Sequence, residues 1–453
     1  MASAPRTGTL AGLTTSGELP TPGAVEGYRA GRSLLGLARA PRLGGGPWLL
    51  ALGAFFVITT RWLDWQGGIA ATGGQDVYQY ELMSRAAPGL PDGQVGSAYT
   101  ARFLIHWSVG ALAALTGASV ELTYRIACLG TMAGFAVTAR LCLVRLGVTG
   151  WALRLCLALA VLNPYALRYY ALVPGYLSDV VFQLGLAVAL LGALSRRSWT
   201  LVVGVVVAVL ARQTIIVVAP ILAVWLLVEG RGRPGVRRRL VTALVTAMSP
   251  FAVLAGLDQL TRPFTTSFSP QVPEDTVLPL VAELPATAGV LADHLLRVAA
   301  PLLLVLSLLL ALAVVQLRRR QPFAAEVYLC AVVAAAIVSQ PLVIGPTFPG
   351  FAGNEPRLSA LGFLPLVLCL GAAFRSVRTV VLGRVPAAAL LLLVALASLH
   401  HIYTAVGPAT AAQFVALQGV AAAGAFLVVV LSARWSPETP RPGSLPVVGS
   451  AHD

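Results

Sequence analysis

The feature that most constrains this chain is a series of long apolar runs, most of them close to the length that crosses a lipid bilayer. A helix needs roughly 20 apolar residues to span the hydrocarbon layer. Of the 453 residues, 57% are hydrophobic and 11% are charged, whereas roughly 25% of the residues in a soluble domain are charged. The chain therefore carries apolar surface that needs lipid to cover it.

The runs are continuous and do not alternate with a period of two, so they predict helices and not a barrel. We expect an all-α polytopic membrane protein with about 12 transmembrane helices and further juxtamembrane helices on the outer face. The five cysteines lie inside apolar runs without paired spacing, which indicates neither disulfides nor a thiolate metal site. The expected spans are 47–62, 121–144, 151–168, 178–195, 199–212, 213–229, 240–257, 295–317, 323–345, 358–374, 385–402 and 413–433.

One more apolar run, 101–118, decides the orientation. If it crossed the membrane, every later span would invert, and the arginine clusters at 196–197, 231–239 and 318–320 would face outward. That arrangement violates the positive-inside rule. We therefore expect 101–118 to be an interfacial helix on the outer face, which puts both termini in the cytosol.

This orientation divides the chain into three parts. Residues 1–45 and 436–453 are expected to be disordered cytosolic tails, and the first contains no hydrophobic core of a signal peptide. Residues 46–435 form the membrane domain, with one outer loop at 63–120 that holds interfacial helices and a second at 258–294. The acidic residues collect on the outer face, whose expected segments are 63–120, 169–178, 258–294, 346–357 and 403–412.

Net charge does not point to nucleic acid. The formal charge is +14 and all 32 basic residues are arginine, a bias that suggests a GC-rich bacterial genome. Most of these arginines lie in short clusters between apolar runs, without the interleaved exposed aromatics of a nucleic-acid interface. Membrane topology explains them better.

Two acidic residues in outer segments are candidates for chemistry. Asp76 lies on a glycine-flanked turn that is expected to open a helix, and Asp179 heads the span 178–195. A carboxylate in such a place can act as a general base or hold a divalent ion. Each residue can equally be a helix cap, because Asp is favoured at helix N-termini.

Three arginines are candidates for binding an anion. Arg102 begins the interfacial helix, Arg212 lies at the turn between two short spans, and Arg357 follows Glu355 just before the span 358–374. A guanidinium suits a phosphate group. Because an arginine facing lipid costs roughly 2.5 kcal/mol or more, Arg212 is expected near the outer surface or in a wet cavity. A headgroup anchor at Arg102 and a structural ion pair at Glu355 and Arg357 are the alternatives.

The histidines show no spacing typical of a metal site. His294 and the pair at 400–401 lie near the expected ends of spans. We expect them to be interfacial caps, because neither an HxxxH nor an HExxH pattern occurs.

The order of these features resembles the GT-C class of membrane glycosyltransferases, which take a sugar from a polyprenyl-phosphate carrier at the outer face. The similar segments are 75–78, 99–104, 177–179, 211–214 and 354–357, within residues 47–375. The resemblance implies that Asp76 is the catalytic base toward an acceptor hydroxyl and that Asp179 is a second catalytic carboxylate. It further implies that Arg102, Arg212 and Arg357 bind the donor phosphate and that Glu355 and Tyr78 have orienting roles.

The chain departs from the pattern of the class in three ways. No second acid adjoins Asp76, so a divalent metal, although an option, is not indicated. Gln213 stands where Lys or Glu is often found, and no large outer domain is expected after the last span. Acceptor recognition is therefore expected in the membrane cavity and in the loop 258–294.

The leading expectation is an inverting hexosyl- or pentosyltransferase at the outer face of the cytoplasmic membrane. Its expected partners are membrane lipids, a polyprenyl-phosphate sugar as donor, and a cell-envelope glycan or lipid as acceptor, with no nucleic acid. A transporter or flippase for a lipid-linked sugar is the first alternative, and it should contain inverted repeats and broken mid-membrane helices. A non-catalytic assembly partner with the same fold is the second, and it predicts a closed or unlined outer cavity.

Overall fold

Apolar helices dominate the computed structural model, which describes residues 46–60, 69–92, 95–231, 234–266, 288–344, 355–377, 383–399 and 411–435. Within these residues, seven helices are long and apolar enough to cross a membrane, and an eighth crossing results if one bent pair counts as a single span. The chain is therefore an all-α polytopic membrane protein. The seven are Val120–Arg145, Pro174–Ser195, Val236–Phe264, Ala292–Arg318, Ala325–Leu342, Glu355–Ser376 and Gln413–Ala433.

Four other expected spans coincide with shorter apolar helices. These have 14 to 16 residues, and at 1.5 Å per residue they are shorter than the roughly 30 Å hydrocarbon layer. By helix length and composition, seven or eight of the described helices qualify as crossings, and the expected count of about 12 stays a prediction. The four are α1 (Gly46–Thr59), α9 (Ser198–Ala211), α10 (Ile215–Glu229) and α18 (Arg384–Leu399).

The expected span 151–168 is bent. Helix α6 (Gly150–Leu162) and the following turns η4 (Pro164–Arg168) and α7 (Tyr169–Leu172) meet at an angle of 45°. Pro164 has no backbone N–H to continue the helix, and the Asn163 side chain instead accepts hydrogen bonds from the backbone N–H groups of Tyr165 and Ala166 at 2.9 and 3.1 Å. The chain restarts there in a new direction.

Close backbone contact joins α8 (Leu177–Ser195), which follows the turn η5 (Pro174–Tyr176), to α9. A Cβ atom added at Gly192 would lie 2.3 Å from the backbone N of Leu201, and one at Gly204 would lie 2.2 Å from that of Ala189. Only glycine allows this approach. The two helices form a tight hairpin, so the residue that ends α9 returns to the start of α8.

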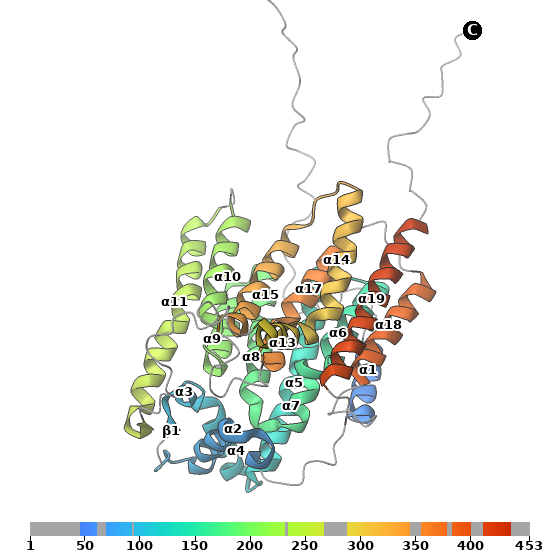
Figure 1. Cartoon of the computed structure of the whole chain (residues 1–453). Coiled ribbons are helices and arrows are strands. Elements are labelled where there is room, and N and C mark those ends of the chain that lie inside the picture. The colour runs from blue at the N-terminus through green and yellow to red at the C-terminus, as the bar shows by residue number, and fades with distance from the viewer. Residues whose placement is uncertain are drawn as a thin grey trace, which may run out of the picture. The chain divides into compact units, whose positions relative to one another are not determined.

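Three helices that follow one another in the chain cover one end of the upright helices (Figure 1). They are α2 (Ile69–Ala86), α3 (Ser97–Thr100) and α4 (Phe103–Thr116), and α4 packs on α2 and on α5 (Val120–Arg145). Helix α4 begins directly after Arg102 and is too short to be among the long candidate spans. Its position at the end of the helical bundle agrees with the expected interfacial helix.

A parallel pair of two-residue strands links this end to α11 (Val236–Thr261). Strand β1 (Val95–Gly96) pairs with β2 (Thr265–Thr266), which follows the turn η6 (Arg262–Phe264). Helix α11 is longer than the expected span 240–257 at both ends. The first residues of the expected loop 258–294 therefore lie in this helix. The rest of that loop up to residue 287, and both expected tails, lie outside the described residues.

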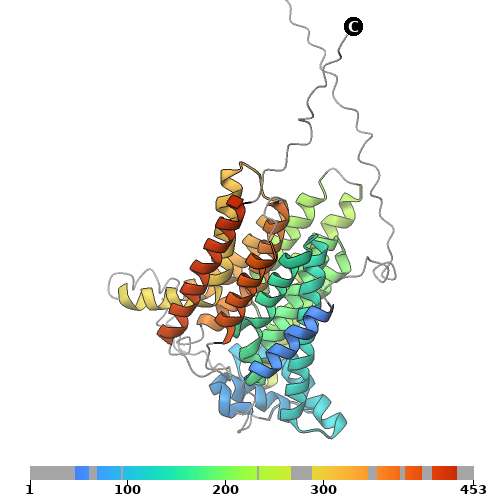
Figure 2. The ribbon, with the colours of Figure 1, turned by 90° about the vertical axis from the view of Figure 1, so that its right-hand side faces the viewer.

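One helix of the C-terminal half is buried among helices from both halves of the chain. Helix α17 (Phe363–Ser376) packs against α5, α6, α14 (Leu303–Arg318) and α15 (Ala325–Ile344), and its residues from Phe363 to Phe374 are all buried. It is preceded by α16 (Glu355–Ser359) and η8 (Ala360–Gly362), while η7 (Ala300–Leu302) precedes α14. Helix α19 (Ala411–Trp435) packs on α14 and α18. Helix α13 (Ala288–Ala299) lies across the direction of the upright helices (Figure 2).

Candidate functional site

Five of the residues singled out in the sequence come together at one end of the helical bundle. They belong to α2, the residue before α4, the first turn of α8, the break after α9, and α16. We call this group the acid–arginine cluster. Its members are Asp76, Arg102, Asp179, Arg212 and Arg357.

Arg357 lies between the two carboxylates. Its Nη2 is 3.7 Å from Oδ2 of Asp76, and its Nε is 3.6 Å from Oδ2 of Asp179. The guanidinium carbon lies 3.9 Å from the ring centroid of Tyr176, a cation–π contact. Arg357 is thus held by two acids and one aromatic face, and only 7% of its side chain is exposed.

Arg212 forms an ion pair with Asp179. The α8–α9 hairpin explains this pair, because Asp179 stands in the first turn of α8 and Arg212 directly follows α9. The exposed fractions of the two side chains are 10% and 2%. Asp179 is therefore not a simple helix cap, since its carboxylate pairs with guanidinium groups.

Asp76 is the accessible acid of the cluster. Its side chain is 30% exposed, and its Oδ1 accepts a hydrogen bond from the Tyr99 hydroxyl at 3.0 Å. The predicted turn and helix cap at Asp76 are wrong, because α2 begins at Ile69 and continues through residues 73 and 74. Glycine lowers helix propensity by only about 1 kcal/mol relative to alanine, which the packing of α2 on α4 can offset.

Arg102 contacts protein and is not a plain headgroup anchor. Its guanidinium donates to the Tyr80 hydroxyl and lies 5.7 Å from the centroid of the Tyr80 ring. The ring of Tyr80 stacks on that of His106 at 4.0 Å, and His106 Nδ1 lies 2.8 Å from the Tyr124 hydroxyl. This buried stack holds in place the tyrosine to which Arg102 donates.

Sequence reasoning missed Tyr80 and chose Tyr78 instead. Tyr80 is four residues after Asp76 and shares its helix face, whereas a residue two positions away points elsewhere. The structure agrees with this spacing, because Tyr78 is 53% exposed and Tyr80 is fully buried. Helical spacing from Asp76 is the signal that points to Tyr80, the tyrosine that contacts Arg102.

Burial sets the protonation of the groups around Asp76. It raises the pKa of Tyr80, and together with the Asp76 charge it raises the pKa of Tyr99. Both phenols therefore stay neutral and can donate. Burial, with a smaller contribution from Arg102, lowers the pKa of His106 well below its usual range, so this ring is neutral.

The cluster contains more positive than negative charge. It holds three guanidinium groups, two of them paired with the two carboxylates, and the buried Nε and Nη1 atoms of Arg357 and Oδ2 of Asp179 make no hydrogen bond. Buried charges are costly unless they are paired, and buried polar groups are normally hydrogen-bonded. An anionic ligand would satisfy both requirements.

Glu355 does not join the cluster, although Arg357 is two residues away. Its Oε1 lies 3.6 Å from Nδ1 of His294, and the exposed fractions of the two side chains are 4% and 1%. The predicted role of His294 as an interfacial cap is wrong, because its ring is buried between α15 and α16.

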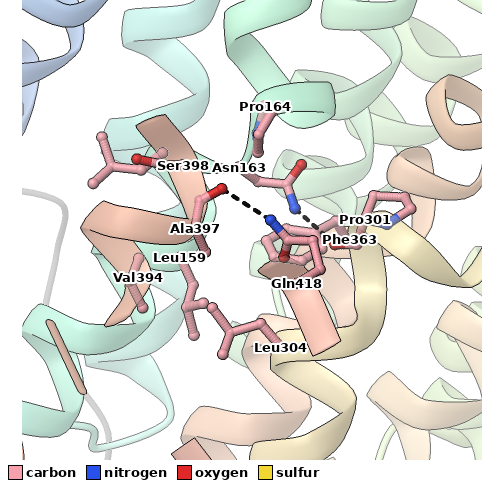
Figure 3. A pocket seen from close by; sticks show the side chains of 11 residues that line it. Leu159, Asn163, Pro164, Pro301, Leu304, Phe363, Val394, Ala397, Ser398 and Gln418 are labelled. Atoms are coloured by element: carbon pink, nitrogen blue, oxygen red, sulfur yellow. Dashed lines mark hydrogen bonds between the residues drawn. The ribbon is translucent and has the colours of Figure 1, made fainter. Parts of the chain in front are cut away.

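A separate small pocket lies among α6, α14, α17, α18 and α19. Asn163 donates from Nδ2 to the carbonyl of Pro301 at 2.8 Å, and Gln418 donates from Nε2 to that of Ala397 at 2.9 Å (Figure 3). None of its lining residues belongs to the acid–arginine cluster. Among the described residues, no group of three His, Cys, Asp or Glu side chains is arranged to hold a metal ion.

Comparison with known proteins adds nothing to the geometry of the acid–arginine cluster. No protein-family model matches the chain, and no curated protein or solved structure matches it either.

Proposed function

We propose that the chain is an inverting membrane glycosyltransferase of the GT-C type, which moves a sugar from a polyprenyl-phosphate carrier to a cell-envelope glycan or lipid. One observation carries the proposal: a partly exposed carboxylate, Asp76, is ion-paired with Arg357 inside a cluster that has an excess of positive charge. A base and an anion site side by side are what this transfer needs.

Asp76 is the candidate general base. The Tyr99 hydroxyl holds Oδ1, and Arg357 faces Oδ2 at 3.7 Å, so the carboxylate has a fixed orientation and an open side. The acceptor hydroxyl attacks the anomeric carbon, its proton passes to Asp76, and the bond from that carbon to the phosphate oxygen breaks. The phosphate leaves with the electron pair, and the configuration at the sugar inverts.

Asp179 has a different role from the one that the resemblance implied. With 2% of its side chain exposed and two arginines within ion-pair distance, it is poorly placed to touch an acceptor. We assign it as a positioning residue that holds Arg212 and Arg357. Its negative charge lowers the cost of burying both guanidinium groups.

Arg102, Arg212 and Arg357 are the candidate phosphate ligands. The phosphate gains negative charge as the sugar leaves, and guanidinium groups fixed in a dry site stabilise that charge. Nη1 of Arg357 is a buried donor without a partner and is the most direct candidate for the first contact. The excess positive charge favours the lipid phosphate product over neutral lipids.

The proposed site faces away from the cytosol. Residues 196–197 follow the end of α8 opposite to Asp179, and 318–320 lie at the turn between α14 and α15, at the end far from α2 and α4 (Figure 1). Arginine-rich turns stay in the cytosol. On this proposal the cluster lies at the outer face of the cytoplasmic membrane.

The decisive experiment compares Asp76→Asn with the wild-type chain in membrane vesicles. The assay measures transfer of labelled sugar from polyprenyl-phosphate donors, with mannose, galactose, glucose and arabinose tested in turn. Asp76→Asn should abolish transfer while insertion and melting temperature stay close to those of the wild type. Asp92→Asn, an exposed change in the loop after α2, is the matched control.

Sugar transfer that survives Asp76→Asn contradicts the proposal. Movement of a lipid-linked sugar across proteoliposomes, without any transfer to an acceptor, would instead identify a flippase. If neither activity occurs with any donor, the chain is a non-catalytic partner.

A further inference from the structure

His294 occupies a buried position that no part of the proposed chemistry uses. Its Nε2 lies 2.9 Å from the backbone carbonyl of Pro341 in α15, and its Nδ1 faces Oε1 of Glu355 at 3.6 Å. Neither His294 Nδ1 nor Glu355 Oε2 makes a hydrogen bond. Two ionisable side chains thus face each other away from water.

The geometry fixes where one hydrogen must be. A carbonyl oxygen only accepts, so Nε2 carries the hydrogen that points to Pro341. Nδ1 of a neutral ring and Oε1 of an ionised carboxylate are then both acceptors, and two acceptors that face each other at 3.6 Å in a buried site repel one another. One proton between Nδ1 and Oε1 removes that conflict, whichever of the two atoms carries it.

The position of Glu355 connects this pair to the acid–arginine cluster. Glu355 and Arg357 are two residues apart in the short helix α16, and residues at that spacing point in different directions. Glu355 faces α13, whereas Arg357 faces Asp76 and Asp179. Holding one side chain therefore sets the rotation of α16 and the direction of the other.

We propose that His294 and Glu355 share one buried proton and act as positioning residues, which lock α16 so that Arg357 reaches both Asp76 and Asp179. This inference rests on the proposed function for the identity of the ligand that Arg357 binds. The contact between His294 and Glu355 is independent of that function.

The test uses farnesyl phosphate as a short polyprenyl-phosphate probe, with binding to the detergent-solubilised full chain measured by titration. Glu355→Gln should bind within about twofold of the wild type, because its amide N–H donates to Nδ1 without a shared proton. Glu355→Leu and His294→Phe should each weaken binding about tenfold, because each removes the contact between Nδ1 and Oε1 that holds α16. Asp293→Asn changes an exposed neighbour on α13 and is the control.

A second comparison separates positioning from a merely structural role. In an Arg357→Gln background, adding Glu355→Leu should not weaken farnesyl phosphate binding further, because Glu355 acts through Arg357. A full additional tenfold loss overturns the proposal. So does Glu355→Gln binding as weakly as Glu355→Leu, because the amide should replace the shared proton.

Failure of the proposed function gives a different result. If the wild-type chain does not bind farnesyl phosphate, the ligand assignment is wrong, and the pair is judged by melting temperature. The double variant His294→Phe with Glu355→Leu should then lose less than the sum of the two single losses. A loss equal to the sum shows that the two side chains do not interact.

Discussion

Asp76 Oδ2 and Arg357 Nη2 lie 3.7 Å apart, although α2 and α16 stand near opposite ends of the membrane domain in the sequence. The same guanidinium reaches Asp179, which forms a further ion pair with Arg212. The three contacts join four separate elements into one group.

Replacing Arg357 should reveal whether its planar geometry matters. Arg357→Lys keeps the charge but not the flat fork that faces two carboxylates, so it should lose about as much farnesyl phosphate affinity as Arg357→Gln, roughly tenfold or more. Titration of the solubilised variants measures this. Arg375→Lys, a half-exposed arginine at the other end of α17, should bind like the wild type. Full binding by Arg357→Lys would mean that charge alone is sufficient.

Tyr99 should influence transfer through Asp76. Tyr99→Phe removes the hydroxyl that donates to Asp76 Oδ1 at 3.0 Å and leaves the carboxylate free to rotate. The rate of sugar transfer should fall about three- to tenfold, the usual effect of one hydrogen bond. Tyr78→Phe, on the exposed face of the same region, should leave the rate unchanged. Equal effects of the two substitutions would remove Tyr99 from the site.

The α8–α9 hairpin should depend on its glycines. In Gly192→Val the new side chain would overlap the backbone of Leu201, since even a Cβ lies 2.3 Å from the Leu201 nitrogen. Overpacking of this kind costs roughly 1–3 kcal/mol, so the melting temperature should fall clearly. Gly130→Ala on α5, where an added Cβ meets nothing within 4 Å, is the control. An unchanged melting temperature in Gly192→Val would contradict the tight hairpin.

Acid should destabilise the protein through His106. Burial lowers the pKa of this ring well below that of an unfolded histidine, about 6.5. Below about pH 6.5 the unfolded chain therefore binds a proton that the folded chain does not, so this histidine destabilises the fold increasingly as pH falls, and it has no effect above that value. Melting temperatures between pH 5 and 8 measure the slope.

The comparison for that slope is His106→Phe. Phenylalanine retains the ring stack on Tyr80 and removes the titrating group, although the hydrogen bond to the Tyr124 hydroxyl is lost. The variant should be less stable at neutral pH, with a smaller loss of stability on acidification. An identical acid slope in both proteins would mean that His106 does not contribute to it.

Individual residues show which parts of the site could be predicted from sequence. Arg102 and Arg212 lie where their segments predicted, at the start of α4 and at the break after α9, because hydrophobic length and helix breaks are local properties. The sequence singles out Asp76 but predicts a turn there, whereas the residue lies inside α2. Packing of α2 on α4 offsets the low helix propensity of the two preceding glycines. His294 was misassigned because its partners, Pro341 and Glu355, come from other helices.

The sequence by itself determined that this is a multi-helix membrane protein and which segments are apolar helices, because lipid imposes a length and a composition on each segment separately. It also determined that Arg102, Asp179 and Arg212 lie at segment ends. Only the tertiary structure decided that Arg357 faces Asp76 and Asp179 while Glu355 faces His294. The reason is physical: such pairings depend on the rotation of α2, α8, α13 and α16 against one another, and that rotation is fixed by packing between residues far apart in the chain.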